Sequence, residues 1–199
     1  MIKSILFDMD GVLVDSHDSW VYIFNKTLKK FENKKVSIKE FDAKVWSKAF
    51  EQTAKKYFKA PVKEIRAYYA GIYNEYRKRL KIMPGAVETL SGLKSKGVKL
   101  ALVSNTQRKV VKRLLKDIKM LKYFDFVLGG DDVKKGKPAP DLLNKAMKLL
   151  KLKKKDAFFV GDTRWDRMAA GKAKLRFVGY KIDGDGRVED LKGLLSLIV

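Results

Sequence analysis

The sequence predicts an α/β protein in which a parallel sheet carries helices on both faces and is interrupted by a helical insertion. Short apolar segments alternate with amphipathic helical patterns over residues 1–15 and 82–199, whereas residues 16–81 show helical periodicity alone. Strands separated by whole helices pair in parallel rather than as hairpins. A length of 199 residues suits one domain with a modest insertion. We therefore predict a core domain (1–15 and 82–199) and an inserted helical domain (16–81).

The predicted strands are short, apolar and rich in β-branched or aromatic residues. They cover residues 2–7, 98–103, 124–129, 157–160 and 175–180. Helical patterns follow over about 85–96, 106–117, 140–151, 164–173 and 187–198. Gly97 is suited to end the first of these helices, and Pro140 to begin the third.

The insertion contains aromatic side chains at helical spacing, as in Trp20, Phe24 and Phe31. This spacing predicts a helical core. The same segment carries 17 Lys and Arg against 7 Asp and Glu. The insertion is therefore strongly basic.

The composition restricts the class of protein. The net charge is +22, and there are no cysteines, which excludes disulfides, thiolate metal sites and cysteine nucleophiles. No apolar run approaches the roughly 18 residues of a membrane span, and no signal peptide is evident, so a cytoplasmic location is expected. The charge suits either attraction of polyanions or the lysine-rich surface of a high-temperature or high-salt host. We favour the second interpretation because the basic residues are spread through the whole chain.

Polar residues follow several of the predicted strands at the point where each strand ends. In a parallel sheet these ends meet at one edge, where ligands bind. The set consists of Asp8, Asp10 and Gly11 after the first strand, Ser104 and Asn105 after the second, Lys137 before Pro138, and Asp162 with Asp166 after the fourth.

This set of side chains favours phosphate chemistry with a metal ion. Clustered carboxylates repel one another and call for a cation, and an all-oxygen ligand set without Cys or His favours Mg²⁺ over zinc. Lys137 and Ser104 suit a phosphate group, because one neutralises charge and the other donates a hydrogen bond. Gly11 lets the backbone approach an anion. A carboxylate can also attack phosphorus and form an aspartyl-phosphate.

The motifs D-x-D-G, S-N, K-P and G-D-T-x-x-D, in this order, resemble the haloacid dehalogenase (HAD) superfamily. The fragments FDMDGVLVDS, LVSNT, GKPAPD and VGDTRWDRMAAGKAK are similar to the branch that holds phosphoglycolate phosphatase and β-phosphoglucomutase. The resemblance covers nearly the whole chain. It implies a Rossmann-like core, a helical cap domain over residues 16–81, and a Mg²⁺-dependent phosphatase that acts on small phosphorylated metabolites.

The resemblance also implies roles for the set. Asp8 is expected to be the nucleophile and Asp10 the general acid and base. The metal ligands are expected to be Asp8, the Asp10 carbonyl and Asp162, with Asp166 bound directly or through water. The phosphate ligands are expected to be the side chains of Ser104 and Lys137 and the backbone N–H groups of Gly11 and Asn105.

Two alternatives stay open. Val12 stands where many phosphatases of the superfamily have Thr. The mutase branch and some phosphatases have an apolar residue there, so Val12 does not decide between a phosphatase and a sugar-phosphate mutase. The other alternative is a phosphatase or a binding protein for nucleic-acid phosphates.

His17 is expected to lie at the hinge of the cap rather than to act in catalysis. Either a monomer or a homodimer is compatible with the sequence. The candidates for substrate selection in the cap are Lys48, Lys55, Lys56, Arg66 and Arg77.

Overall fold

The computed structural model describes residues 2–46, 48 and 50–198. The chain divides into two compact units, a core unit (Met1–Val14 and Ile82–Val199) and a helical unit (Asp15–Lys81). The short strands β2 (Val14–Asp15) and β3 (Lys81–Ile82) contain the two points at which the chain passes between the units, and they pair with each other. Within the described residues, no helix combines the length and the apolar character that crossing a membrane requires.

The core unit contains a six-stranded parallel sheet in the order β5-β4-β1-β6-β7-β8. This confirms the predicted fold class. The chain steps from β1 through β4 to β5 in one direction and then returns across the sheet to β6 and β7. A ligand site is expected where the order reverses, beside β1. The strands are β1 (Ser4–Phe7), β4 (Lys99–Val103), β5 (Phe126–Leu128), β6 (Ala157–Gly161), β7 (Arg176–Tyr180) and β8 (Gly186–Val188).

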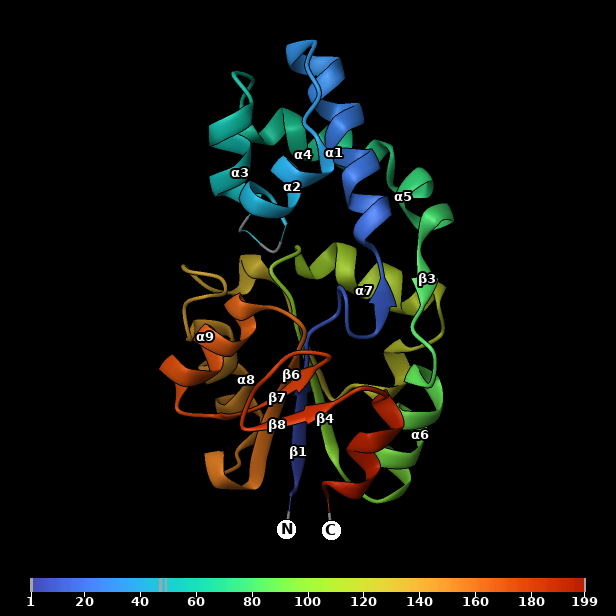
Figure 1. Cartoon of the computed structure of the whole chain (residues 1–199), viewed down its shortest axis with the longest axis vertical. Helices are drawn as coiled ribbons and strands as arrows, with labels where there is room; N and C mark the ends of the chain where they lie inside the picture. The colour runs from blue at the N-terminus through green and yellow to red at the C-terminus, as the bar shows by residue number, and fades with distance from the viewer. Residues whose placement is uncertain (1, 47, 49, 199) are drawn as a thin grey trace. The chain divides into compact units, whose positions relative to one another are not determined.

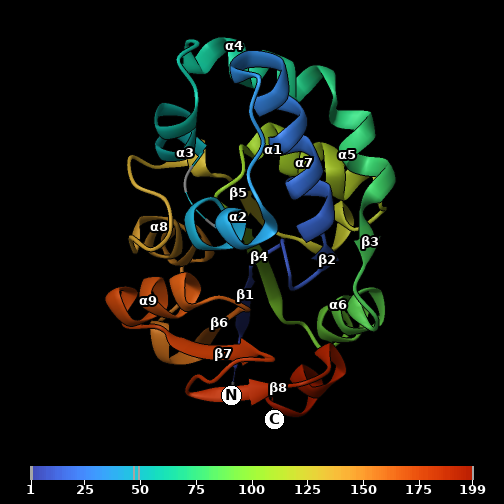
Figure 2. The same cartoon turned by 45° about the horizontal axis from the view of Figure 1, so that its top comes forward.

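Helices cover both faces of this sheet. Two views agree that α8 (Asp141–Leu150) and α9 (Arg164–Ala173) lie on one side of the strands, and α6 (Ala86–Ser95) on the other (Figures 1 and 2). The right-handed connection between parallel strands accounts for this arrangement, since opposite steps along the sheet place helices on opposite faces. The helix α7 (Arg108–Asp117) joins β4 to β5, and three short 3₁₀ helices lie at Leu121–Tyr123, Gly130–Asp132 and Lys154–Asp156.

One apolar cluster of the core unit lies between the sheet and α8 and α9. Leu6, Ala101 and Phe159 from the strands pack with Leu142 of α8, and the small residue Ala169 faces them from α9. All five side chains are fully buried. Such burial of the central strands explains their near-continuous apolar sequence.

The predicted helix over residues 187–198 is wrong. Residues Gly186–Val188 form strand β8, which pairs in parallel with β7, and a 3₁₀ helix follows over Leu191–Ser196. Gly184, Gly186 and Gly193 make a long α-helix unfavourable here. The carboxylate of Asp190 instead caps the short helix by accepting the N–H of Lys192 at 2.7 Å.

The helical unit contains five helices among its described residues. Most of its aromatic side chains belong to one cluster around the buried residues Phe24, Phe41 and Ile65, as the helical spacing predicted. The rings meet mostly edge to face, for example Phe24 with Tyr57 at 5.2 Å between centroids. The helices are α1 (His17–Glu32), α2 (Ile38–Lys44), α3 (Phe50–Tyr57), α4 (Val62–Gly71) and α5 (Tyr73–Arg79).

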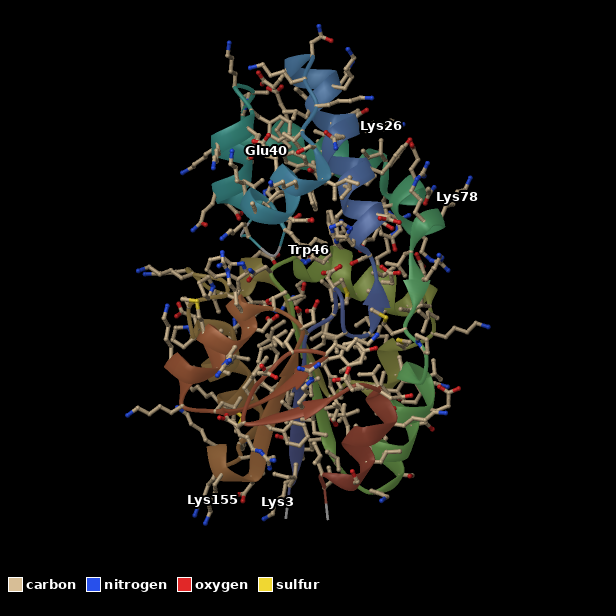
Figure 3. The ribbon with its side chains drawn as sticks, viewed as in Figure 1. Lys3, Lys26, Glu40, Trp46, Lys78 and Lys155 are labelled. Carbon is tan, nitrogen blue, oxygen red and sulfur yellow. The ribbon has the colours of Figure 1, made fainter. Side chains whose placement is uncertain are left out.

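The surface charge consists mainly of lysines that point to solvent. Figure 3 shows Lys3 and Lys155 of the core unit, and Lys78 of α5, reaching away from the ribbon. Of the five described non-glycine residues with positive φ, four are lysines, and two of them, Lys151 and Lys174, follow the last turns of α8 and α9. Glycine or asparagine is favoured in that conformation. Lysine thus occurs even where backbone geometry disfavours it. This favours the interpretation that the high lysine content is a general property of the composition rather than part of a binding surface.

Candidate active site

Asp8 lies directly after β1 and continues the sheet by one residue. Its N–H donates to the carbonyl of Val160 at 2.9 Å. The next residue, Met9, is fully buried, and its carbonyl accepts the N–H groups of Leu13 and Val14 at 2.9 and 3.2 Å. The chain therefore turns sharply after Met9. This turn keeps Asp10 close enough to Asp8 for its charge to act on the Asp8 carboxyl.

Gly11 is required by a close approach of Asp162. Its φ is +82°, and a Cβ atom at this position would lie 2.0 Å from Oδ2 of Asp162. The Gly11 N–H donates to the carbonyl of Val14 at 2.8 Å. The Gly11 N–H that we expected to bind phosphate thus has a partner within the turn, and its contact with a phosphate stays a prediction. The glycine also leaves room for a carboxylate.

Three carboxylates gather at this edge of the sheet. Asp8, Asp162 and Asp166 each offer an oxygen, and these oxygens lie within 4.8 Å of one another. Asp162 comes directly after β6, and Asp166 is the third residue of α9. Gly161, at the end of β6, leaves room for the side chain of Asp166, because a Cβ at Gly161 would lie 2.5 Å from Cβ of Asp166.

Lys137 lies among these carboxylates. Its ammonium is 2.7 Å from Oδ1 of Asp8 and 2.7 Å from Oδ1 of Asp166, and the side chain is only 5% exposed. The other oxygen of Asp166 accepts hydrogen bonds from the N–H and the hydroxyl of Thr163. The motif G-D-T-x-x-D contains Thr163, to which no role was assigned. The T-x-x-D spacing is a helix capping pattern and was the signal for it.

The charges of the site are not balanced. Burial, together with the nearby charges of Asp166 and Asp10, raises the pKa of Asp8 to about 7 even though Lys137 opposes the shift. Burial and the charges of Asp166 and Asp8 likewise raise the pKa of Asp162 well above its usual value. Burial alone would lower the pKa of Lys137, but the two carboxylates outweigh it and raise that pKa. One ammonium therefore does not neutralise the cluster.

The donor set fits a hard divalent cation. Oδ1 of Asp162 is buried and has no hydrogen-bond partner among the described residues, which is costly unless a ligand or an ion is bound there. Carboxylate oxygens are the ligands that Mg²⁺ prefers. These oxygens and the unbalanced charge agree with the predicted magnesium site.

Ser104 and Asn105 follow β4 at the same edge of the core unit. Ser104 is 1% exposed, its N–H donates to the carbonyl of Leu128 at 3.1 Å, and its hydroxyl oxygen accepts the N–H of Thr106 at 3.1 Å. The side-chain amide of Asn105 contacts the backbone of Lys137 through two hydrogen bonds. The sequence indicated only the backbone N–H of Asn105 as a phosphate ligand and did not indicate these side-chain contacts.

His17, in the helical unit, contacts an acid and two aromatic rings. Its Nε2 lies 2.6 Å from Oδ1 of Asp42, and its ring packs edge-on against Phe41 and Trp46. These contacts join the first turn of α1 to α2 and the residues after it. They give His17 a structural role within the helical unit.

Comparisons with known proteins agree with the motifs. The family model for haloacid dehalogenase-like hydrolases matches residues 5–180. A phosphoglycolate phosphatase of Aquifex aeolicus is 32% identical over 187 residues, covering 90% of this chain and 86% of that protein. The pyrophosphatase PpaX of Halalkalibacterium halodurans is 30% identical over 190 residues, covering 94% and 88%.

A solved structure supports the same relationship. The crystal structure of a predicted phosphoglycolate phosphatase from Haemophilus somnus matches with a TM-score of 0.83 and 25% identity, and it covers 100% of this chain and 98% of that one. The match of the family model to most of the chain, together with these relatives, shows that this protein belongs to the haloacid dehalogenase-like hydrolases.

Proposed function

We propose that this hydrolase is a Mg²⁺-dependent phosphatase of small phosphomonoesters that uses Asp8 as its nucleophile. The observation that carries the proposal is the buried contact of Lys137 with Asp8 and Asp166. Beside it lies Oδ1 of Asp162, which has no hydrogen-bond partner in the part of the chain that the structure describes. A carboxylate held next to a buried cation is placed to react with an anionic phosphate, because the cation offsets the repulsion between the two anions.

The first step transfers the phosphoryl group to the protein. An oxygen of Asp8 attacks phosphorus, the bond between phosphorus and the ester oxygen breaks, and the alcohol leaves with a proton from Asp10. Lys137 and the Ser104 hydroxyl bind the phosphoryl oxygens, where negative charge is concentrated during transfer. The product of this step is an aspartyl-phosphate on Asp8.

The second step returns the enzyme to its starting state. Asp10, now ionised, takes a proton from a water molecule, whose oxygen attacks the phosphorus. The bond between phosphorus and Asp8 breaks, and inorganic phosphate leaves. Asp10 then holds the proton needed for the next cycle.

The residues that would hold Mg²⁺ are Asp8, Asp162 and Asp166, with the backbone carbonyl of Asp10. A bound Mg²⁺ supplies positive charge that lowers the repulsion between the phosphate and these carboxylates. Asp166 also holds Lys137 and Thr163, so its part in the metal site stays a prediction.

The substrate class follows from the relatives and from charge. We propose a small, highly anionic ester such as phosphoglycolate, with residues 16–81 acting as a cap domain whose basic side chains select it. The similarity to a pyrophosphatase favours pyrophosphate as a second candidate. The mutase alternative requires that the aspartyl-phosphate be passed to a sugar hydroxyl instead of water.

A panel of substrates tests the proposal. Phosphoglycolate, pyrophosphate, an aryl phosphate, an oligonucleotide 5′-phosphate, and β-glucose 1-phosphate with a trace of glucose 1,6-bisphosphate are each incubated with and without Mg²⁺. Release of inorganic phosphate that stops in chelator and returns with Mg²⁺ is expected. Formation of glucose 6-phosphate with little phosphate release would favour the mutase instead.

Thermal unfolding gives a test of the metal site that does not need turnover. Mg²⁺ binds the folded carboxylate cluster and should therefore raise the melting temperature. At a Mg²⁺ concentration about 100 times the dissociation constant, binding adds about 2.7 kcal/mol to the free energy of unfolding. The rise should be smaller in Asp162→Asn. An unchanged melting temperature in both proteins would contradict a metal site at these residues.

A further inference from the structure

We propose that Asn105 is a positioning residue, whose side-chain amide sets the place of the Lys137 ammonium by holding the Lys137 backbone. The proposal rests on the function proposed above, in which Lys137 binds phosphate. Oδ1 of Asn105 accepts the N–H of Lys137 at 2.8 Å, and Nδ2 donates to the carbonyl of Lys137 at 2.9 Å. One side chain thus binds both polar groups of one residue, 32 positions further along the chain.

This pair of hydrogen bonds fixes both the position and the orientation of the Lys137 backbone. A single hydrogen bond leaves rotation about its axis, whereas two from a planar amide do not. Only one orientation of the amide satisfies both bonds, since the N–H needs an acceptor and the carbonyl needs a donor. Asn105 acts here as a neighbouring strand would act on an extended residue.

Lys137 depends on such support because it lies outside regular structure. The segment between β5 and α8 contains turns and bends around Lys137, with no strand or α-helix. Asn105, in contrast, follows Ser104, which is tied to β5 through the carbonyl of Leu128. The Asn105 amide therefore fixes the backbone of Lys137, a loop residue, relative to the sheet.

The neighbouring Gly136 gives a second observation in favour of this role. A Cβ atom at Gly136 would lie 2.5 Å from Oδ1 of Asn105. Any larger residue would push the amide away from the Lys137 N–H. The glycine before Lys137 leaves space for the Asn105 side chain.

The position of the Lys137 backbone matters for the reaction because it sets where the ammonium lies. Its ammonium must lie 2.7 Å from both Asp8 and Asp166, inside a buried site. A shift of the backbone moves the ammonium away from the nucleophile and from the phosphate. Misplacement of a reacting group by 1 Å can cost about 100-fold in rate.

The chain provides a matched control in Asn25. Its amide makes the same two contacts with the backbone of Val36, accepting the N–H at 2.8 Å and donating to the carbonyl at 3.2 Å. Both contacts lie within the helical unit and are part-buried, like those of Asn105. Asn25→Ala therefore removes the same chemistry at a place that carries no lysine of the site.

The experiment is a double-mutant cycle on the full chain. We measure kcat/KM on the preferred phosphoester, and the inhibition constant of inorganic phosphate, for Asn105→Ala, Lys137→Ala, the double variant and Asn25→Ala. Asn105→Ala should lower kcat/KM by about 10- to 100-fold and weaken phosphate inhibition, with Asn25→Ala within about 2-fold of wild type. The double variant should be no slower than Lys137→Ala, because Asn105 acts only through that lysine.

Two results would overturn the proposal. Losses that multiply in the double variant would show that Asn105 acts independently of Lys137, and an Asn105→Ala loss no larger than that of Asn25→Ala would show a structural effect alone. If Asn105→Ala does not fold, Asn105→Asp replaces it, because it keeps the shape but places an acceptor against the Lys137 carbonyl.

A wild-type protein that releases no phosphate from any substrate would refute the proposed function separately. Crystal structures of the wild type and Asn105→Ala then decide the inference. The distance from Nζ of Lys137 to Oδ1 of Asp8 should lengthen in the variant, and an unchanged distance would refute the positioning role.

Discussion

Two lysines of this protein make nearly the same contact with a carboxylate, but in very different surroundings. In the core unit, Nζ of Lys137 lies 2.7 Å from Asp8, and the lysine side chain is 5% exposed. In the helical unit, Nζ of Lys26 lies 2.6 Å from Glu75, and each side chain is 35% exposed. The distance between the lysine nitrogen and the carboxylate oxygen is thus almost the same in both places.

The two carboxylates nevertheless respond in opposite directions. Burial raises the pKa of Asp8 to about 7 in spite of the lysine. Hydrogen bonds from Lys26 and from the hydroxyl of Tyr22 lower the pKa of Glu75 below its usual value. The comparison shows that burial and neighbouring carboxylates, more than the lysine contact, distinguish a site that can hold a cation from an ion pair that joins two helices.

The largest expected difference between the two pairs is in activity. Asp8→Asn removes the nucleophile and should lower turnover of an aryl phosphate by about 10³-fold or more, with the fold retained. Glu75→Gln changes the same kind of group in the helical unit and should leave turnover within about 2-fold. Steady-state kinetics at saturating Mg²⁺ measures both. A wild-type rate in Asp8→Asn would exclude Asp8 as the nucleophile.

Replacing the lysine of each pair should lower the free energy of unfolding by different amounts. Lys137→Met leaves buried carboxylates without their cation, and this should cost about 3–5 kcal/mol of unfolding free energy. For a chain of this size that corresponds to a melting temperature lower by about 10 °C. Lys26→Met should lower it much less, because water solvates Glu75. Scanning calorimetry at pH 8 without Mg²⁺ checks this, and equal shifts would show that burial does not distinguish the pairs.

The smallest expected effect is the pH dependence of the Glu75 pair. The pKa of Glu75 is lowered on folding, so its contribution to stability is present above its ordinary pKa of 4.5 and is lost as the pH falls through the folded value. Wild type should therefore be more stable than Glu75→Gln in urea at pH 7, and the two should converge near pH 3. A difference that persists at pH 3 would contradict the proposed cause.

The motifs along the chain predicted most of the site because parallel strands bring their ends together at one edge. Asp8 and Asp162 were predicted from their places at strand ends, Asp166 from its place one helical turn later, and Lys137 from its place before Pro138. The structure brings these four residues into contact. The motifs did not indicate that the N–H of Gly11 donates to the carbonyl of Val14 within the turn. The predicted C-terminal helix was wrong because pairing with β7 outweighed helical spacing in a glycine-rich segment.

Some features depended on the tertiary structure alone. Periodicity and turn residues are local, so the sequence by itself determined the alternation of strands and helices, the helical insertion and the identity of the carboxylates. It could not determine that the Asn105 amide binds the backbone of Lys137, or that Asp162 approaches Gly11 closely. Those contacts join residues far apart in the chain, and their geometry exists only once the sheet has formed. The raised pKa of Asp8 likewise arises from burial that the fold imposes.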